Sequence, residues 1–122
     1  MMQPMSCTKE VVLPVEPDEA WEAVSDETAL EAWLAERVEL DLRPGGDATF
    51  TMPGGEERRG MVEEVAPGER LTFWWWPEQG ESSRVTFELA PAVGGTRIRV
   101  TETPAGPTAH ATPMLRSAFA LA

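Results

Sequence analysis

The chain holds few side chains that can act as an acid, a base or a nucleophile. Its 122 residues include one histidine, His110, one cysteine, Cys7, and no tyrosine. A catalytic triad would have to use His110, but the segment around it, PAGPTAHATP, has the proline and small residues of a solvated loop. A lone cysteine as close to residue 1 as Cys7 is more often incidental than a tuned nucleophile. The sequence therefore predicts no catalytic residue.

Metal and phosphate sites are not predicted either. No pair of cysteines or histidines has metal-ligand spacing, and no segment follows the calcium-loop pattern of alternating carboxylates. Two glycine turns, at 43–47 and 53–55, lack the later glycine and lysine of phosphate-binding loops. We therefore expect neither a metal ion nor another cofactor.

The net charge limits the kinds of partner that the chain can bind. Ten Lys and Arg against 21 Asp and Glu give a net charge of −11, which would repel phosphate backbones and anionic lipid surfaces. No apolar run approaches the roughly 20 residues that span a bilayer. We expect no nucleic acid and no membrane partner. A single cysteine, and no signal-peptide pattern in the first twenty residues, predict a cytoplasmic protein.

The pattern of apolar residues predicts two short helices followed by a series of strands. A β-branched run over 10–15 predicts the first strand, Pro17 suits the first position of a helix, and Ser25 or Asp26 can cap a second helix that carries Leu30 and Trp33. From Val38 onward the period changes to two, with glycine and proline turns between the runs. Six further strands are predicted, at 38–43, 48–52, 58–65, 71–76, 85–89 and 97–100. Strands segregated from helices indicate an α+β fold.

Four strings of residues, in order, resemble a known family. They are PDEAWEAVSD, LEAWLAERVELDLRPGG, GMVEEVAPGERLTFWW and RVTFELAPAVGGTRIRVTET, which together cover about residues 8 to 103. The chain resembles the START-like helix-grip (SRPBCC) superfamily, in the branch of activators of Hsp90 ATPase and polyketide-cyclase-like proteins. Each string is weakly specific alone, and their joint order carries the resemblance.

The resemblance implies one helix-grip domain over 1–122. Such a domain has a curved antiparallel sheet of six or seven strands, two short helices, and a C-terminal helix packed on the concave face, with an apolar cavity between sheet and helix. Here that helix is limited to 112–122, where Leu115 and Phe119 would be its inward anchors because they lie four residues apart. The family's glycine-tryptophan segment and its longer helix are missing from the sequence.

The aromatic residues are the most informative candidates for a site. Alternation places Phe73 and Trp75 on the same sheet face as Phe87, and Trp33 comes from the second helix. These side chains either fill a core or line a pocket for an apolar small molecule. The predicted ligand-binding set is Trp33, Phe50, Phe73, Trp75, Phe87, Leu115 and Phe119.

Trp74 and Trp76 should point to the opposite face. They predict a contact surface, for a second copy of the chain or another protein, unless Arg58, Arg84 or Arg97 stacks over them.

Three functions follow in order of preference. The first is binding of an apolar small molecule. The second is a protein-interaction or chaperone-regulator module, and the third is a cyclase-type enzyme. For the third, Glu63, Glu64 or Glu102 would supply a base at the pocket rim, although a solvated acidic surface explains the same residues.

Overall fold

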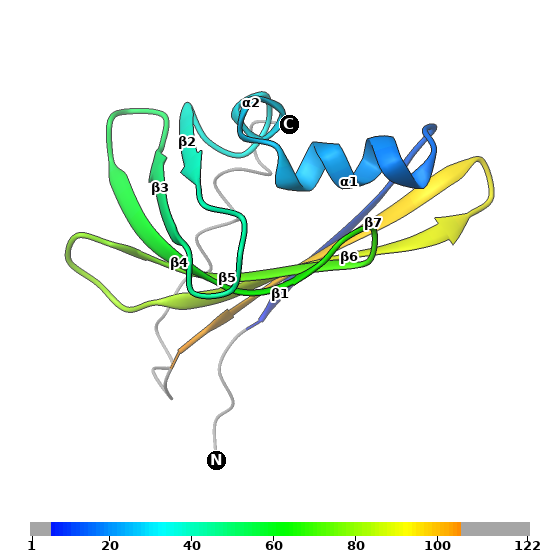
Figure 1. Ribbon diagram of the computed structural model, residues 1–122. Coiled ribbons are helices and arrows are strands. Elements are labelled where there is room, and N and C mark those ends of the chain that lie inside the picture. The colour runs from blue at the N-terminus through cyan, green and yellow to red at the C-terminus, as the bar shows by residue number, and fades with distance from the viewer. Residues whose placement is uncertain (1–5, 106–122) are drawn as a thin grey trace, which may run out of the picture.

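The computed structural model describes residues 6–105 of the chain. Within this part, seven strands form one antiparallel sheet with the order β1-β7-β6-β5-β4-β3-β2 (Figure 1). The strands are β1 (Cys7–Leu13), β2 (Arg37–Leu40), β3 (Asp47–Thr51), β4 (Glu57–Ala66), β5 (Arg70–Pro77), β6 (Ser83–Ala92) and β7 (Gly95–Pro104). The predicted meander is confirmed from β2 to β7. The chain's first strand pairs with β7, so β1 and β2 form the two edges of the sheet.

Two short helices link β1 to β2. Helix α1 (Pro17–Ser25) begins with proline at its first turn, followed by Asp18 and Glu19, which favour the positive end of the helix dipole. Helix α2 (Glu27–Glu31) is capped by the side chain of Asp26, which accepts a hydrogen bond of 2.9 Å from the backbone N–H of Ala29. Of the two predicted caps, Asp26 is the one the structure uses.

Several boundaries differ from the sequence-based expectation. The strand predicted at 38–43 ends at Leu40, and those predicted at 85–89 and 97–100 extend over Ser83–Ala92 and Gly95–Pro104. Strand β1 begins at Cys7 rather than Glu10, because its pairing with β7 continues to Glu102. Helix α2 ends at Glu31, so Trp33 lies in the loop that follows it and not on the helix. The Glu31 carboxylate accepts a 2.9 Å hydrogen bond from the backbone N–H of Val38, which connects the end of α2 to the start of β2.

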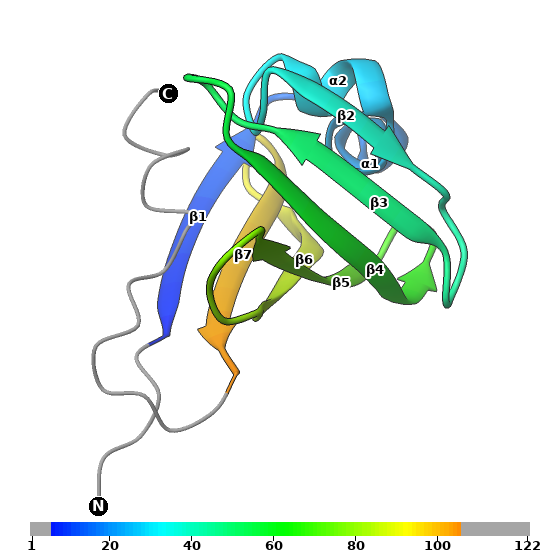
Figure 2. The ribbon, with the colours of Figure 1, turned by 90° about the vertical axis from the view of Figure 1, so that its left-hand side faces the viewer.

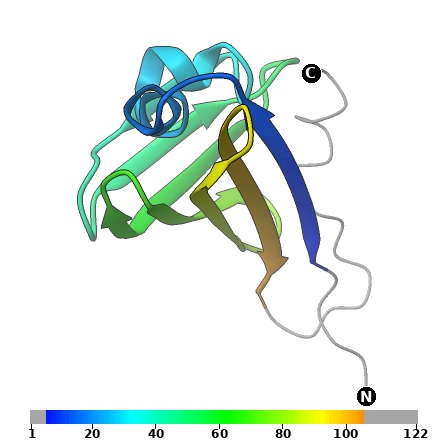
Figure 3. The ribbon, with the colours of Figure 1, turned by 90° about the vertical axis from the view of Figure 1, so that its right-hand side faces the viewer.

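The helices cover one face of the curved sheet (Figures 2 and 3). Apolar side chains from every second strand position meet α1 and α2 on this concave face and form the core. Its largest fully buried members are Trp75, Phe50, Phe73, Phe87, Leu30 and Leu34. The alternation predicted for β5 is confirmed, since Leu71, Phe73 and Trp75 are buried on the concave side whereas Trp74 and Trp76 are half-buried on the convex side.

The register of β4 contains an irregularity between Val62 and Glu64. Val62 pairs with Phe73, and Glu64 pairs with Thr72, so Glu63 is the extra residue. A bulge of this kind shifts the alternation of the strand by one position. As a result Glu63 and Glu64 both lie on the convex face, and Val65 returns to the core side.

The packing around Trp75 requires a glycine on the neighbouring strand. Gly60 pairs with Trp75, and a Cβ atom at Gly60 would collide with the backbone carbonyl oxygen of Trp74 and lie 3.4 Å from the Phe50 ring. A backbone oxygen cannot move aside as a flexible side chain can. Strand β4 therefore needs glycine at this position.

We expect Gly60→Ala to lower the free energy of unfolding by about 1–3 kcal/mol, the usual cost of overpacking. This exceeds the gain of about 0.4–1 kcal/mol that alanine brings by restricting the unfolded chain. Urea denaturation would measure the change, with Met61→Ala at the next, exposed position of β4 as the control. Equal or greater stability of Gly60→Ala would contradict the predicted close approach.

Candidate ligand-binding site

The four predicted site residues of the sheet form one aromatic cluster. Phe50, Phe73, Trp75 and Phe87 are all buried on the concave face. Phe50 lies 5.3 Å from Trp75 and 5.4 Å from Phe73 between ring centroids, and Phe73 lies 5.7 Å from both Trp75 and Phe87. Most of these pairs are edge-on, the favoured geometry for aromatic rings. The cluster is thus a packed layer in which the rings contact each other.

The side chains of Glu102 and Arg58 hold Trp75 in place. Its indole Nε1 donates a hydrogen bond of 3.0 Å to Oε2 of Glu102, and both residues have no exposed surface. On the other side, the Arg58 guanidinium lies 4.8 Å from the centre of the Trp75 ring and makes an ion pair of 2.8 Å with Glu56. The Arg58 side chain is only 8% exposed, and its Nη1 has no hydrogen-bond partner. A cation–π contact offsets part of the cost of burying this cation.

Trp33 differs from the other aromatic residues because it is half-buried and borders two clefts. Its ring packs 5.7 Å from Phe87, and its Nε1 donates a 2.9 Å hydrogen bond to the carbonyl oxygen of Ala23 in α1. These two contacts fix the indole between the helix and the sheet. The side chain therefore forms a rigid wall of both clefts.

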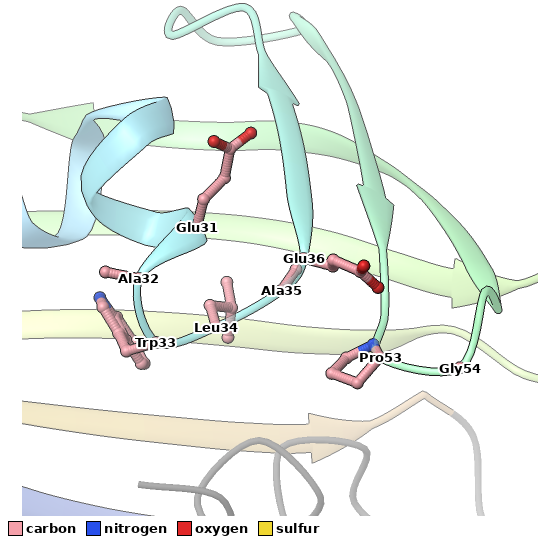
Figure 4. Close-up of a pocket in the computed structure, with 8 residues that line it drawn as sticks. All are labelled: Glu31, Ala32, Trp33, Leu34, Ala35, Glu36, Pro53 and Gly54. Atoms are coloured by element: carbon pink, nitrogen blue, oxygen red, sulfur yellow. The ribbon is translucent and has the colours of Figure 1, made fainter.

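The first cleft has a volume of about 390 Å³ and opens between the loop after α2 and the turn after β3 (Figure 4). Trp33, Leu34 and Pro53 border it, together with the backbone of the loop. The Glu31 carboxylate points away from Trp33 in Figure 4, toward β2, where it binds the Val38 N–H. The carboxylate of Glu36 lies near Pro53, so this cleft combines polar and apolar walls.

The second cleft, of about 380 Å³, lies between α1, Trp33 and the β1–β7 edge of the sheet. Its walls are almost entirely apolar. Strand β1 contributes Val11 and Leu13, β7 contributes Ile98 and Val100, and α1 contributes Ala23 and Val24. The backbone register explains this gathering, because Val11 pairs with Ile98 and the side chains of a pair lie on the same face. We call this space the edge cleft.

Of the predicted ligand-binding residues that the structure describes, one lines the edge cleft and the others lie behind it. Trp33 lines the edge cleft, and Phe87 lies behind it in contact with Trp33. Phe50, Phe73 and Trp75 lie deeper, in the packed aromatic layer. Leu115 and Phe119 lie outside the described residues. Sequence reasoning missed Val11 and Lys9 on β1, and Val24 on α1, as lining residues, because no local spacing connects the two elements.

The predicted contact surface lies on the opposite, convex face. There Trp74 Nε1 donates a 2.7 Å hydrogen bond to Oε1 of Glu63, and Arg84 makes a bidentate pair with the same carboxylate. Hydrogen bonds from Arg84 and from Trp74 lower the pKa of Glu63 below its ordinary value. The stabilising effect is therefore present above the pKa of Glu63 in the unfolded chain, and is lost as the pH falls through the lowered pKa.

The structure corrects two expectations about charged residues. Arg58 stacks over the buried Trp75 rather than over an outward tryptophan, because it lies on the concave side of β4. The three acids proposed at a pocket rim do not share one place: Glu63 and Glu64 are on the convex face, paired with Arg84 and Arg70, whereas Glu102 is buried against Trp75. They therefore do not form a joint acid–base site.

Two further findings apply to the described residues 6–105. No group of three or more His, Cys, Asp or Glu side chains is arranged there to hold a metal ion. None of the helices in this part of the chain is long and apolar enough to cross a membrane. His110 lies outside the described range.

A curved seven-stranded antiparallel sheet, with two short helices inserted after the first strand, fits the START-like helix-grip (SRPBCC) class, and the C-terminal helix predicted over 112–122 lies outside the described residues. Residues 14–118 match the family described as "Activator of Hsp90 ATPase homolog 1-like protein". The chain belongs to this family. The resemblance inferred from the sequence is thus confirmed.

Solved structures support the same fold. Protein MLL2253 from Mesorhizobium loti is 22% identical, with a TM-score of 0.76 over 84% of this chain and 79% of its own. Mll3558 from Rhizobium loti is 27% identical, with a TM-score of 0.69 over 85% and 81%. CalU16 from Micromonospora echinospora is 26% identical, with a TM-score of 0.67 over 83% of this chain and 61% of its own. A comparison with curated proteins finds no match.

We expect the buried tryptophan to matter far more than its outward neighbour. Trp75→Phe removes the hydrogen bond to Glu102, and a bond to a buried carboxyl contributes about 1–3 kcal/mol. Trp74→Phe is the matched control, because it removes the equivalent bond to the exposed Glu63 and should cost about 0.5 kcal/mol. Denaturant melts of the two variants would measure both values. Equal costs would show that the Trp75–Glu102 contact does not stabilise the core.

Proposed function

We propose that the chain binds an apolar small molecule in the edge cleft, between α1, Trp33 and the β1–β7 edge of the sheet. The observation that carries this proposal is the lining: valine, leucine, isoleucine, alanine and tryptophan side chains surround a space of about 380 Å³. Ligand pockets typically measure about 300–1,000 Å³ and have mostly apolar walls. The volume suits a small ligand.

The rest of the concave face supports a binding function rather than catalysis. The aromatic layer of Phe50, Phe73 and Trp75 is closely packed, and it reaches the cleft wall through Phe87, which contacts both Phe73 and Trp33. Trp33, held by Phe87 and by the Ala23 carbonyl, offers a flat apolar surface to a ligand. The C-terminal helix predicted over 112–122 would add Leu115 and Phe119 as further contacts, and this part of the proposal concerns residues outside the described range.

A single substitution can fill the edge cleft without disturbing the core. Val11 lines the cleft and is 45% exposed, so a tryptophan there has room to enter the cleft from its edge. Val12 is the matched control: it is the next residue of β1, is 44% exposed, and pairs with Arg97 on the other face of the sheet.

We expect the folded protein to bind the neutral dye Nile red at one saturable site. Val11→Trp should weaken this binding at least ten-fold because the added ring occupies the cleft, whereas Val12→Trp should leave it unchanged. Fluorescence titration measures the affinity, and circular dichroism checks the fold of each variant. If well-folded protein binds no dye, or both variants behave like the parent chain, the edge cleft is not a ligand site.

A second candidate function is a contact with another protein through the convex face. Trp74 and Trp76 are half-buried there, and Met61, which pairs with Trp74, is exposed. Aromatic residues and methionine are enriched in protein interfaces. The family's name, taken from an activator of the Hsp90 ATPase, agrees with such a role. The simplest partner is a second copy of the chain.

We expect the double variant Trp74→Thr and Trp76→Thr to keep the fold and to weaken any homodimer that the parent chain forms. Sedimentation velocity over a range of concentrations would measure self-association, and thermal melting would report the fold. A double variant that unfolds, with no earlier change in association, would assign these tryptophans to stability rather than to contact.

A further inference from the structure

The edge cleft has one charged side chain on its concave rim. Lys9 lies on β1 two residues before Val11, and it pairs with Val100, so its side chain belongs to the same face as the apolar walls. Lys9 is exposed and is the sole lysine of the 122 residues; the other nine basic residues are arginines. An ammonium group therefore lies at the mouth of a cleft whose walls, apart from Glu10, are apolar.

The neighbouring carboxylate does not neutralise this ammonium group. Glu10 also borders the cleft, but its Oε2 accepts a 2.6 Å hydrogen bond from Nε of Arg99. Successive residues of a strand point to opposite faces, and Glu10 pairs with Arg99 on the convex side. None of the ion pairs found within residues 6–105 includes Lys9.

The net charge of the whole chain makes the position of Lys9 significant for the kind of ligand that can bind. A net charge of −11 repels anions in general, so an anionic ligand needs a nearby cation. Screening limits long-range effects to about 8–10 Å at physiological salt, and within that distance a single ammonium can dominate. The edge cleft offers apolar contact along its walls and one positive charge at its rim.

We propose that the ligand of the edge cleft is an amphipathic anion, with an apolar body against Ile98, Val100 and Trp33 and a carboxylate or similar oxyanion paired with Lys9. This inference rests on the proposed function and specifies its ligand class. The apolar body supplies most of the binding free energy, because each buried methylene contributes about 0.8 kcal/mol. The ion pair selects the headgroup.

The test compares two ligands that differ only in the headgroup. Decanoate and decanol, each below its aggregation concentration, are titrated calorimetrically into the parent chain, Lys9→Met, Lys9→Arg and Arg37→Met. Arg37 is an exposed cation on β2, the opposite edge of the sheet, so Arg37→Met changes the net charge by the same amount as Lys9→Met. Circular dichroism confirms that each variant is folded.

We expect Lys9→Met to weaken decanoate binding about two- to five-fold, as for an exposed ion pair, and to leave decanol binding unchanged. Lys9→Arg should retain the preference for decanoate, and Arg37→Met should have no effect on it. If decanol and decanoate bind alike and Lys9→Met changes neither, the headgroup assignment is overturned while the proposed apolar site stands. If neither ligand binds folded protein, the proposed function fails and the headgroup assignment fails with it.

Discussion

Within residues 6–105, the two helices that cover the concave face of the sheet are much shorter than the sheet is wide. Seven strands about 4.8 Å apart span roughly 29 Å, whereas the nine residues of α1 rise only about 14 Å. Large side chains fill the centre of the face, where Trp75 and Phe50 pack together. At the β1 edge Val11 stays 45% exposed, and the edge cleft opens. In the part of the chain that the structure describes, the cleft lies where α1 and α2 do not cover the sheet, and its position is set by the order of the strands.

The filled part of the concave face, around Trp75, and its open part, the edge cleft, depend on different interactions. In the filled part, Glu102 and Arg58 fix the indole of Trp75 at its nitrogen and at its ring face. Burying polar groups is costly unless they are paired, and these contacts also specify one ring orientation. In the open part, Trp33 is held by a backbone carbonyl and by Phe87. A rigid wall beside a space that side chains do not fill is the arrangement that small-molecule sites share.

Much of the fold could be predicted from the sequence, because alternation in the strands reports directly which face is buried. The alternation of 71–76 separated Trp75 from Trp74 correctly. The bulge at Glu63 could not be predicted, since it depends on pairing with β5. The end of α2 before Trp33 was also missed, because the period of Leu30, Trp33 and Leu34 continues past the residue where the chain turns toward β2. The edge cleft joins Val11, Val24 and Val100 from three elements, and only the tertiary structure shows them together.

Lys9 also has a plain structural explanation, which is compatible with the ligand assignment. Strand β1 is an edge strand with Val11 and Val12 exposed on opposite faces, and such strands tend to pair with other chains. A charged side chain discourages that pairing, but either sign of charge on either face would serve. Glu10 supplies a charge on the convex face of β1, where Arg99 binds it. The protection of an edge does not require the chain's sole lysine to lie on the concave side, beside Val100 and the apolar walls. A headgroup contact accounts for both its sign and its face.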